Sequence, residues 1–226
     1  GIPVQYVTGT ARFFGRDYVV NPHVLIPRPE TEVLCETILS AYNQPYCALQ
    51  PPVPLRVLDI GTGSGCIAVT LALDLWNSSV SAWDISGEAL LTARENAHRL
   101  QAQVNFEWHD VLSLDEAALA ATPFDIIVSN PPYVCDRERK DMTEQVLAHE
   151  PHTALFVPDN DPLLFYRAIA DYGTTHLNPH GLLAFEINPL FAKEMCEMLE
   201  SKGYEQVEVK TDQYGKERVV VGVARQ

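Results

Sequence analysis

Short apolar runs alternate with segments of helical periodicity along most of this chain. From residue 55 onward the runs have the length of buried strands, and the segments between them place apolar residues three or four positions apart. Strands are expected at Leu55–Ile60, Val80–Ile85, Val104–His109, Phe124–Ser129, Leu182–Ile187, Tyr204–Lys210 and Arg218–Ala224. This alternation predicts an α/β fold with a doubly wound, mostly parallel seven-stranded sheet, whose last two strands form an antiparallel pair.

The segments between the strands carry signals for helix starts. Helices are expected over Ser64–Leu73, from Ser86 to Leu100, near residues 115–121, after Asp161, and over Leu190–Lys202. Ser86 is expected to cap the second helix, because a serine hydroxyl accepts a hydrogen bond from a free N–H of the first turn. Asp161 is expected to cap the fourth helix, with Pro162 at its first position.

The amino-terminal part of the chain follows a different pattern. Residues 4–20 alternate apolar and polar positions around Gly15-Arg16, which predicts a β-hairpin, and residues 30–42 have one apolar face, which predicts a helix. Residues 43–54 contain four prolines and several polar residues, which is typical of a linker. We therefore divide the chain into a hairpin and helix over 1–42, a linker over 43–54, and an α/β domain over 55–226.

The residues Asn130-Pro131-Pro132-Tyr133 follow the strand expected at Phe124–Ser129. Neither proline can continue a sheet, because proline lacks an N–H and has a fixed φ angle. The Asn130 side chain and the Pro131 carbonyl therefore point in fixed directions, and two such acceptors can hold the –NH2 group of an amide or an aromatic amine. An exposed tight turn is the alternative. The adjoining strand and aromatic residue favour a ligand site, because ligands of open α/β sheets bind at the carboxyl ends of strands.

A glycine-rich loop follows the first strand of the α/β domain. It reads Gly61-Thr62-Gly63-Ser64-Gly65, one residue shorter than the G-x-G-x-x-G spacing of dinucleotide sites. Glycines permit a tight turn and let a ligand approach the backbone closely. The loop also precedes a helix whose first N–H groups are free to bind a ligand.

Acidic residues end the next two strands. Asp84 lies about 20 residues beyond the glycine loop, where an acid can accept hydrogen bonds from both ribose hydroxyls of a nucleoside. Asp110 follows the third strand and is expected at the same edge of the sheet. A helix cap or a solvated acid is the alternative for Asp84 alone. A glycine loop and two acids at successive strand ends together favour a nucleoside site.

The charge and the apolar content narrow the possible partners. The net charge is −14, from 16 basic and 30 acidic residues. A nucleic-acid binder needs basic surface to displace counterions from phosphates, so we expect no nucleic-acid partner. No apolar run approaches the roughly 18–20 residues needed to cross a bilayer, so no membrane association is expected. The chain starts at Gly1 without a methionine or a visible signal peptide, which suggests that upstream sequence is missing.

Cysteines and histidines give no sign of a disulfide framework or a metal site. Five cysteines are scattered along the chain without a Cys-x-x-Cys pair, which indicates a reduced, cytoplasmic protein. His149 and His152 lie three positions apart, but Pro151 between them prevents a helical metal-binding face. We expect a loop there, and no metal.

Two groups of residues resemble known families. Asp59–Gly65, Asp84 and Asn130–Tyr133 together resemble the class I S-adenosylmethionine-dependent amino-methyltransferases, which have a Rossmann-like fold. Leu25–Glu32 reads Leu-Ile-Pro-Arg-Pro-Glu-Thr-Glu and resembles the segment upstream of the catalytic domain in release factor glutamine methyltransferases. This segment is the most specific part of the resemblance, because DNA methyltransferases share Asn-Pro-Pro-Tyr.

The resemblance to release factor glutamine methyltransferases covers essentially the whole chain. Val4–Gly9 and Glu150–Leu155 also fit the family. The family usually has a helical amino-terminal domain that helps to dock the release factor, and this chain begins after it. Residues 1–42 are therefore interpreted as a remnant of the docking region, and the isolated chain is expected to show a raised KM for the release factor. Glu186-Ile187-Asn188 stands where the family often has Glu-Ile-Gly, and we interpret this difference as a loop variation.

The resemblance also implies a reaction and residue roles. Family members transfer a methyl group from S-adenosylmethionine to the side-chain nitrogen of the glutamine in the Gly-Gly-Gln motif of peptide chain release factors. The chain is therefore expected to act as a cytoplasmic monomer whose partner is a release factor. Gly61–Gly65 is expected to wrap the methionine part of the cofactor, Asp84 to bind its ribose, and Asp110 and Val111 to flank its adenine. The expected catalytic and substrate-binding residues are Asn130, which also touches the cofactor, with Pro131, Pro132 and Tyr133, and Arg28 and Glu30 as further substrate contacts.

An amide nitrogen is a poor nucleophile, so the enzyme must orient it towards the methyl group and exclude water. Asn130 Oδ1 and the Pro131 carbonyl are expected to accept the two amide hydrogens, and Tyr133 to form an apolar wall. No general base is required. Three alternatives remain open: a DNA or RNA amino-methyltransferase acting on a flipped base, which the net charge opposes; a methyltransferase acting on a ribosomal-protein glutamine, which only Pro27–Glu32 opposes; and a non-catalytic nucleoside-binding module, which the intact Asn130–Tyr133 opposes.

Overall fold

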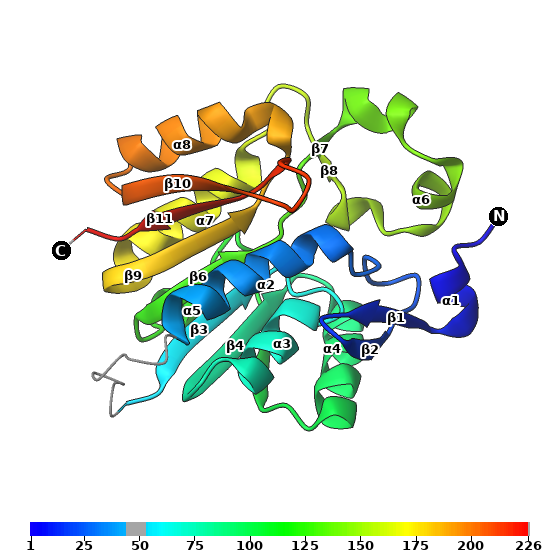
Figure 1. Ribbon diagram of the computed structural model, residues 1–226, viewed down its shortest axis with the longest axis horizontal. Helices are drawn as coiled ribbons and strands as arrows, with labels where there is room; N and C mark the ends of the chain where they lie inside the picture. Colours follow the sequence, from blue (N-terminus) through cyan, green and yellow to red (C-terminus); the bar gives the residue numbers. More distant parts are fainter. Residues whose placement is uncertain (44–52, 226) are drawn as a thin grey trace.

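The computed structural model describes residues 1–43 and 53–225, and its centre is a seven-stranded sheet in the order β10-β11-β9-β6-β3-β4-β5 (Figure 1). β9, β6, β3, β4 and β5 are parallel, β11 is antiparallel to β9, and β10 is antiparallel to β11. The strands are β3 (Leu55–Ile60), β4 (Ser78–Asp84), β5 (Val104–Trp108), β6 (Phe124–Ser129), β9 (Leu177–Glu186), β10 (Glu205–Thr211) and β11 (Glu217–Val223). The predicted doubly wound, mostly parallel sheet is confirmed.

Helices cover both faces of the sheet, because the central strands are apolar on both sides. Val57 packs into one core and its neighbour Leu58 into the other, as the alternation of side chains along a strand requires. One face carries α2 (Pro29–Tyr42), α3 (Cys66–Asp74) and α4 (Gly87–Leu100). The other carries α5 (Glu116–Leu119), α7 (Leu164–His176) and α8 (Ala192–Ser201).

The amino-terminal hairpin is shorter than predicted. β1 (Thr10–Phe13) and β2 (Arg16–Val19) pair as expected, but residues 4–8 form the helix α1 (Val4–Thr8) instead of a strand. Gly9 ends this helix in a left-handed conformation, with φ of 73°, and so separates the helix from the strand. Val4 and Val7 are exposed, so these apolar residues do not form the buried face of a strand.

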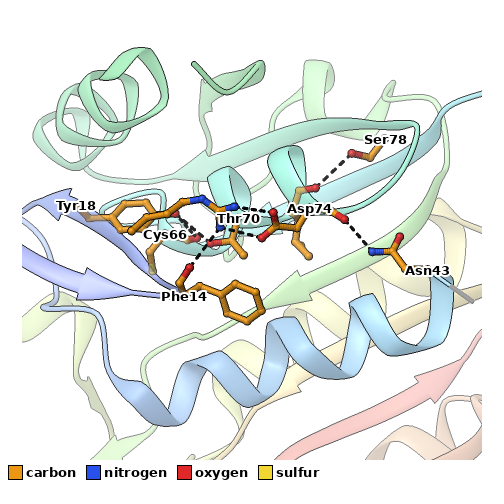
Figure 2. A network of polar contacts seen from close by, with 9 residues as sticks. Phe14, Tyr18, Asn43, Cys66, Thr70, Asp74 and Ser78 are labelled. Carbon is orange, nitrogen blue, oxygen red and sulfur yellow. Dashed lines mark hydrogen bonds and ion pairs between the residues drawn. The ribbon is translucent and has the colours of Figure 1, made fainter. Parts of the chain in front are cut away.

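Polar contacts join this hairpin to the helices on the same face of the sheet (Figure 2). The Arg16 guanidinium donates to both carboxylate oxygens of Asp74, at 2.8 and 2.6 Å. The Tyr18 and Thr70 hydroxyls lie 3.0 Å apart, and Asn43 Nδ2 donates to the Asp74 carbonyl at 2.8 Å. The hairpin, the end of α2 and the end of α3 are therefore fixed to one another. Of the linker expected over 43–54, residues 44–52 lie outside the described part of the chain.

The segment between β6 and α7 contains only short elements. They are β7 (Val134–Cys135), η1 (Asp136–Asp141), α6 (Glu144–His149), η2 (His152–Ala154) and β8 (Phe156–Val157), and η3 (Pro189–Phe191) follows β9. His149 ends α6 and His152 starts η2, so the loop expected for these histidines is wrong. In the described residues, no group of three or more possible ligands is placed to hold a metal ion.

Helix starts were predicted with mixed success. The Ser86 hydroxyl caps α4 by accepting from Ala89 N at 3.1 Å, as expected. Asp161 does not cap α7, because that helix begins at Leu164 and the Asp161 carboxylate accepts hydrogen bonds from Arg167 instead. Within the described residues, none of the helices combines the length and apolar character needed to cross a bilayer.

Candidate active site

The ends of β3 and β6 lie side by side. Ile60 and Ser129 are paired in parallel register, and Ser129 Oγ donates to the Ile60 carbonyl at 2.6 Å. The glycine loop and Asn130 therefore leave the sheet at the same level. From β3 the chain continues to β4 on one side, and from β6 it continues to β9 on the other side. The strand order therefore reverses between β3 and β6, which is where α/β proteins bind ligands. A cavity of about 390 Å³ opens there and is lined by both segments.

The glycine loop holds an unusual backbone conformation. Gly61, Gly63 and Gly65 have φ angles of 76°, 55° and 80°, which residues with a Cβ rarely adopt. A Cβ on Gly65 would lie 3.0 Å from the Cβ of Ala93 in α4, so glycine also permits the close packing of loop and helix. Four loop residues line the cavity, Gly61, Thr62, Gly63 and Ser64, and so does Cys66 at the start of α3.

Asp59 supports the loop from within the core. Its Oδ2 accepts a hydrogen bond of 2.6 Å from the Thr62 hydroxyl. Burial raises the pKa of Asp59 to about 7, against the opposing effect of that hydrogen bond. A fully buried carboxyl therefore lies directly beneath the turn that lines the cavity.

Asp84 ends β4 and lines the same cavity. Its Oδ2 accepts from Gly63 N and its Oδ1 from Ser86 N, both at 2.8 Å. Burial raises the pKa of Asp84, and these backbone hydrogen bonds oppose the rise. Each carboxylate oxygen has a further lone pair, so the side chain can accept two more hydrogen bonds from a ligand.

Asp110 and Val111 lie beyond the end of β5 and line the large cavity, and their contact with an adenine stays a prediction. Asp110 Oδ1 accepts from Leu112 N at 2.9 Å, which closes the turn after the strand. His109 also lines the cavity, with its ring 4.5 Å from that of Trp83. The sequence prediction did not include the apolar lining residues Ile85, which follows Asp84, and Phe165 and Ile169 from the distant helix α7.

Asn130, Pro131 and Pro132 line the large cavity, and Asn130 and Pro131 also line a smaller one of about 170 Å³ beside it. Asn130 Nδ2 donates to the Thr31 hydroxyl at 3.3 Å. Tyr133 lines the smaller cavity only. Its hydroxyl donates to Glu186 Oε1 at 2.9 Å, so this side chain is hydrogen-bonded as well as an apolar wall.

Arg28, which precedes α2, and Glu30, in its first turn, were both predicted to contact the substrate. The structure places them in different surroundings. Arg28 lines both cavities and forms an ion pair with the buried Glu150, which fixes the residues before α2 against the segment before η2. Glu30 lines neither cavity and pairs with Arg218 of β11, 3.3 Å away. The helix turns the side chains of these residues in different directions, so Glu30 faces Arg218, and its part in substrate binding stays a prediction.

Glu186 is a site residue that the sequence prediction missed, and Asn188 supports the site from outside both cavities. Glu186 is buried at the carboxyl end of β9 and lines the smaller cavity. Asn188 is more than a loop variation, because its Nδ2 donates to the Tyr133 carbonyl at 3.3 Å and to Glu138 Oε2 at 3.1 Å. An acid at a strand end, the signal used for Asp84, would have found Glu186.

Comparisons with known proteins show the family of this chain. A family profile described as "Methyltransferase small domain" matches residues 47–156. The release factor glutamine methyltransferase of Bacteroides thetaiotaomicron is 49% identical over 218 residues, which cover 96% of this chain and 74% of that protein. The release factor glutamine methyltransferase of Bacillus subtilis is 41% identical over 222 residues, which cover 97% of this chain and 75% of that protein. The chain belongs to the release factor glutamine methyltransferase family.

Solved structures place this family member among the methyltransferases by fold as well. The release factor-specific protein-(glutamine-N5) methyltransferase of Alicyclobacillus acidocaldarius is 28% identical, with a TM-score of 0.53, and the match covers 92% of this chain and all of that one. A Pyrococcus furiosus methyltransferase has the same fold, with a TM-score of 0.66 at 20% identity over 94% of this chain and 91% of that one. The expected Rossmann-like methyltransferase fold and the family resemblance are both confirmed, and the chain is a methyltransferase.

Proposed function

We propose that this chain transfers a methyl group from S-adenosylmethionine to the side-chain amide nitrogen of the glutamine in the Gly-Gly-Gln motif of a peptide chain release factor. The observation that supports this most strongly is the junction of the two cavities at Asn130 and Pro131. A cofactor-sized space and a smaller space meet at two hydrogen-bond acceptors. That arrangement suits a donor on one side and an amide on the other.

The residues of the large cavity fit S-adenosylmethionine. Its volume of about 390 Å³ lies within the range of small-molecule sites. Gly61 and Gly63 have open space where a Cβ would stand, so a ligand can lie against their backbone. Asp84 can accept the ribose hydroxyls, and Asp110 and Val111 can flank the adenine. When bound, the cofactor supplies an electrophilic methyl group on a sulfonium.

The acceptor residues do three things to the glutamine amide. Asn130 Oδ1 and the Pro131 carbonyl accept its two hydrogens, which leaves the nitrogen free to face the methyl group. The same oxygens stabilise positive charge as it develops on that nitrogen. Fixing the reactants in line contributes roughly 7–11 kcal/mol in favourable cases. No general base is needed, because the methylated nitrogen loses its proton readily to water.

The partner in this proposal is a release factor and not a nucleic acid. A net charge of −14 repels phosphates, whereas a protein loop that projects from its domain can enter a narrow cavity. A monomeric enzyme is part of the same proposal.

Parallel reactions with labelled cofactor test the proposal. The full-length protein is incubated separately with a release factor, with a variant of that factor whose Gly-Gly-Gln glutamine is alanine, with ribosomal proteins, and with DNA and RNA. Label is expected on the intact release factor alone. Label on DNA or on a ribosomal protein, with none on the release factor, would establish the corresponding alternative.

A further inference from the structure

The amide of Asn130 can occupy its position in two orientations. Its oxygen and its –NH2 group have nearly the same shape, and only hydrogen-bond partners distinguish them. A site that accepts the hydrogens of a substrate amide needs the oxygen to face that amide. If the side chain turned over, an –NH2 group would face another –NH2 group, and neither could accept a hydrogen bond. Some feature of the protein must therefore hold the orientation.

Thr31 provides the partner on the nitrogen side. Its hydroxyl accepts from Asn130 Nδ2 at 3.3 Å, and the side chain lies in the first turn of α2 with only 2% of its surface exposed. A hydroxyl can also accept from an amide nitrogen while it donates its own hydrogen elsewhere. The direction of that second bond decides whether Thr31 remains an acceptor towards Asn130.

Glu186 is placed to receive the hydrogen of Thr31. Burial raises the pKa of Glu186, and hydrogen bonding from the Thr31 and Tyr133 hydroxyls opposes this rise by stabilising the carboxylate. Tyr133 donates to Oε1 at 2.9 Å, whereas the buried Oε2 has no hydrogen bond of standard geometry within the described residues. A carboxylate accepts and cannot donate, so it directs the Thr31 hydrogen away from Asn130.

We propose that Thr31 and Glu186 are positioning residues that fix the Asn130 amide with its oxygen towards the substrate nitrogen. This inference rests on the proposed function. In this arrangement Asn130 Nδ2 donates to the Thr31 hydroxyl, and the buried, unpaired Oε2 of Glu186 is the acceptor towards which the Thr31 hydrogen turns. Glu186 also holds the Tyr133 hydroxyl, so one buried carboxylate orients both ends of the Asn130–Tyr133 turn.

The substitution Thr31→Val tests this directly, because valine keeps the shape of threonine and removes its hydroxyl. The loss of one hydrogen bond is expected to lower kcat about tenfold, while KM for the release factor and Kd for the cofactor stay within about twofold. Thr31→Ser restores the hydroxyl and should recover most of kcat. The matched control is Thr70→Val, which removes a buried hydroxyl that contacts Tyr18 and lines neither cavity (Figure 2).

A second measurement does not depend on turnover. The side-chain –NH2 resonances of Asn130 are identified by their absence from Asn130→Ala, and their hydrogen exchange is followed by NMR. Exchange should be faster in Thr31→Val than in the wild type and unchanged in Thr70→Val. Glu186→Gln gives an independent variant, since it replaces one of the two carboxylate oxygens by an –NH2 group that cannot accept a hydrogen bond, and its kcat should fall with cofactor affinity kept.

The outcomes separate this inference from the proposed function. A wild-type enzyme that methylates no release factor contradicts the proposed function. An active wild type whose kcat is unchanged in both Thr31→Val and Glu186→Gln contradicts the inference alone. Failure of Thr31→Ser to restore kcat also contradicts it, as does an equal loss in Thr70→Val. If Thr31→Val does not fold, the kcat of Glu186→Gln and the exchange rate of the Asn130 –NH2 group in that variant decide: faster exchange and a lower kcat support the inference, and unchanged values contradict it.

Discussion

Ser129 Oγ donates a hydrogen bond of 2.6 Å to the carbonyl of Ile60, across the last paired residues of β6 and β3. This contact sets the glycine loop and Asn130 at the same height above the sheet. The order of the strands therefore brings together two segments that are far apart in the sequence. The glycine loop and the Asn130–Tyr133 turn therefore lie side by side because of the strand order alone.

Asp84→Ala should weaken S-adenosylmethionine binding by at least about tenfold, because a charged hydrogen bond contributes roughly 1.5–3 kcal/mol. The variant also releases the N–H of Gly63, which holds the glycine loop in place. Isothermal titration calorimetry measures the change. The control is Asp17→Ala, an exposed carboxylate whose partner is Arg12 in the hairpin. Equal affinity in wild type and Asp84→Ala would remove Asp84 from the cofactor site.

Asn130→Ala should abolish methyl transfer and leave most of the cofactor affinity. In the proposed reaction Asn130 Oδ1 faces the acceptor nitrogen, whereas Asp84 and the glycine loop hold the cofactor. Turnover at saturating cofactor is compared with Asn105→Ala, an exposed asparagine whose amide donates to Glu107. Wild-type turnover in Asn130→Ala would contradict the orienting role.

Gly65→Ala should destabilise the fold, because Gly65 has a φ of 80° and an added Cβ would lie 3.0 Å from Ala93 Cβ. The left-handed backbone alone costs a residue with a Cβ about 1–2 kcal/mol. Gly87→Ala is the control, since Gly87 has an ordinary φ and open space around a Cβ at the start of α4. Urea denaturation gives both free energies of unfolding. Similar values for the two variants would show that the loop conformation is not needed.

The buried Asp59 should make stability depend on pH. Its pKa rises from 3.8 to about 7 on folding, so between these values the folded protein keeps a proton that the unfolded chain has lost. The free energy of unfolding therefore falls as pH rises through this window, by up to about 1.4 kcal/mol per pH unit, and levels off above it. Asp59→Asn lacks this contribution and can still accept from Thr62.

Denaturation of wild type and Asp59→Asn at a series of pH values isolates the effect of Asp59. The stability of the wild type relative to the variant should decrease from about pH 4 to about pH 7. A constant difference over that range would mean that Asp59 is ionised in the fold at ordinary pH.

The sequence predicted the parts of the site that follow from strand ends. Gly61–Gly65, Asp84, Asp110 and Asn130 each come directly after a buried strand, and parallel strands bring such positions to one edge. The sheet was predicted for the same reason, since apolar runs of strand length are a strong local signal.

Contacts between distant segments could not be predicted in this way. Thr31 contacts Asn130 only because α2 packs across the sheet near β9 and β11. The pattern of apolar residues in the sequence does not indicate where a helix packs on the sheet. The position of Glu30 outside both cavities could not be foreseen for the same reason, because the turn of the helix and the position of Arg218 decide where it points. The helix α1 was missed because its exposed valines imitate the alternation of a strand.

Tandem mass spectrometry of a release factor after one round of methylation tests the proposed reaction most directly. The full-length wild-type enzyme and Asn130→Ala are each given the release factor and S-adenosylmethionine, and the modified peptide is fragmented to locate the methyl group. We expect a single methyl group on the side-chain nitrogen of the Gly-Gly-Gln glutamine with the wild type and none with the variant. A methyl group on another residue, or equal modification by both proteins, would contradict the proposed reaction at Asn130.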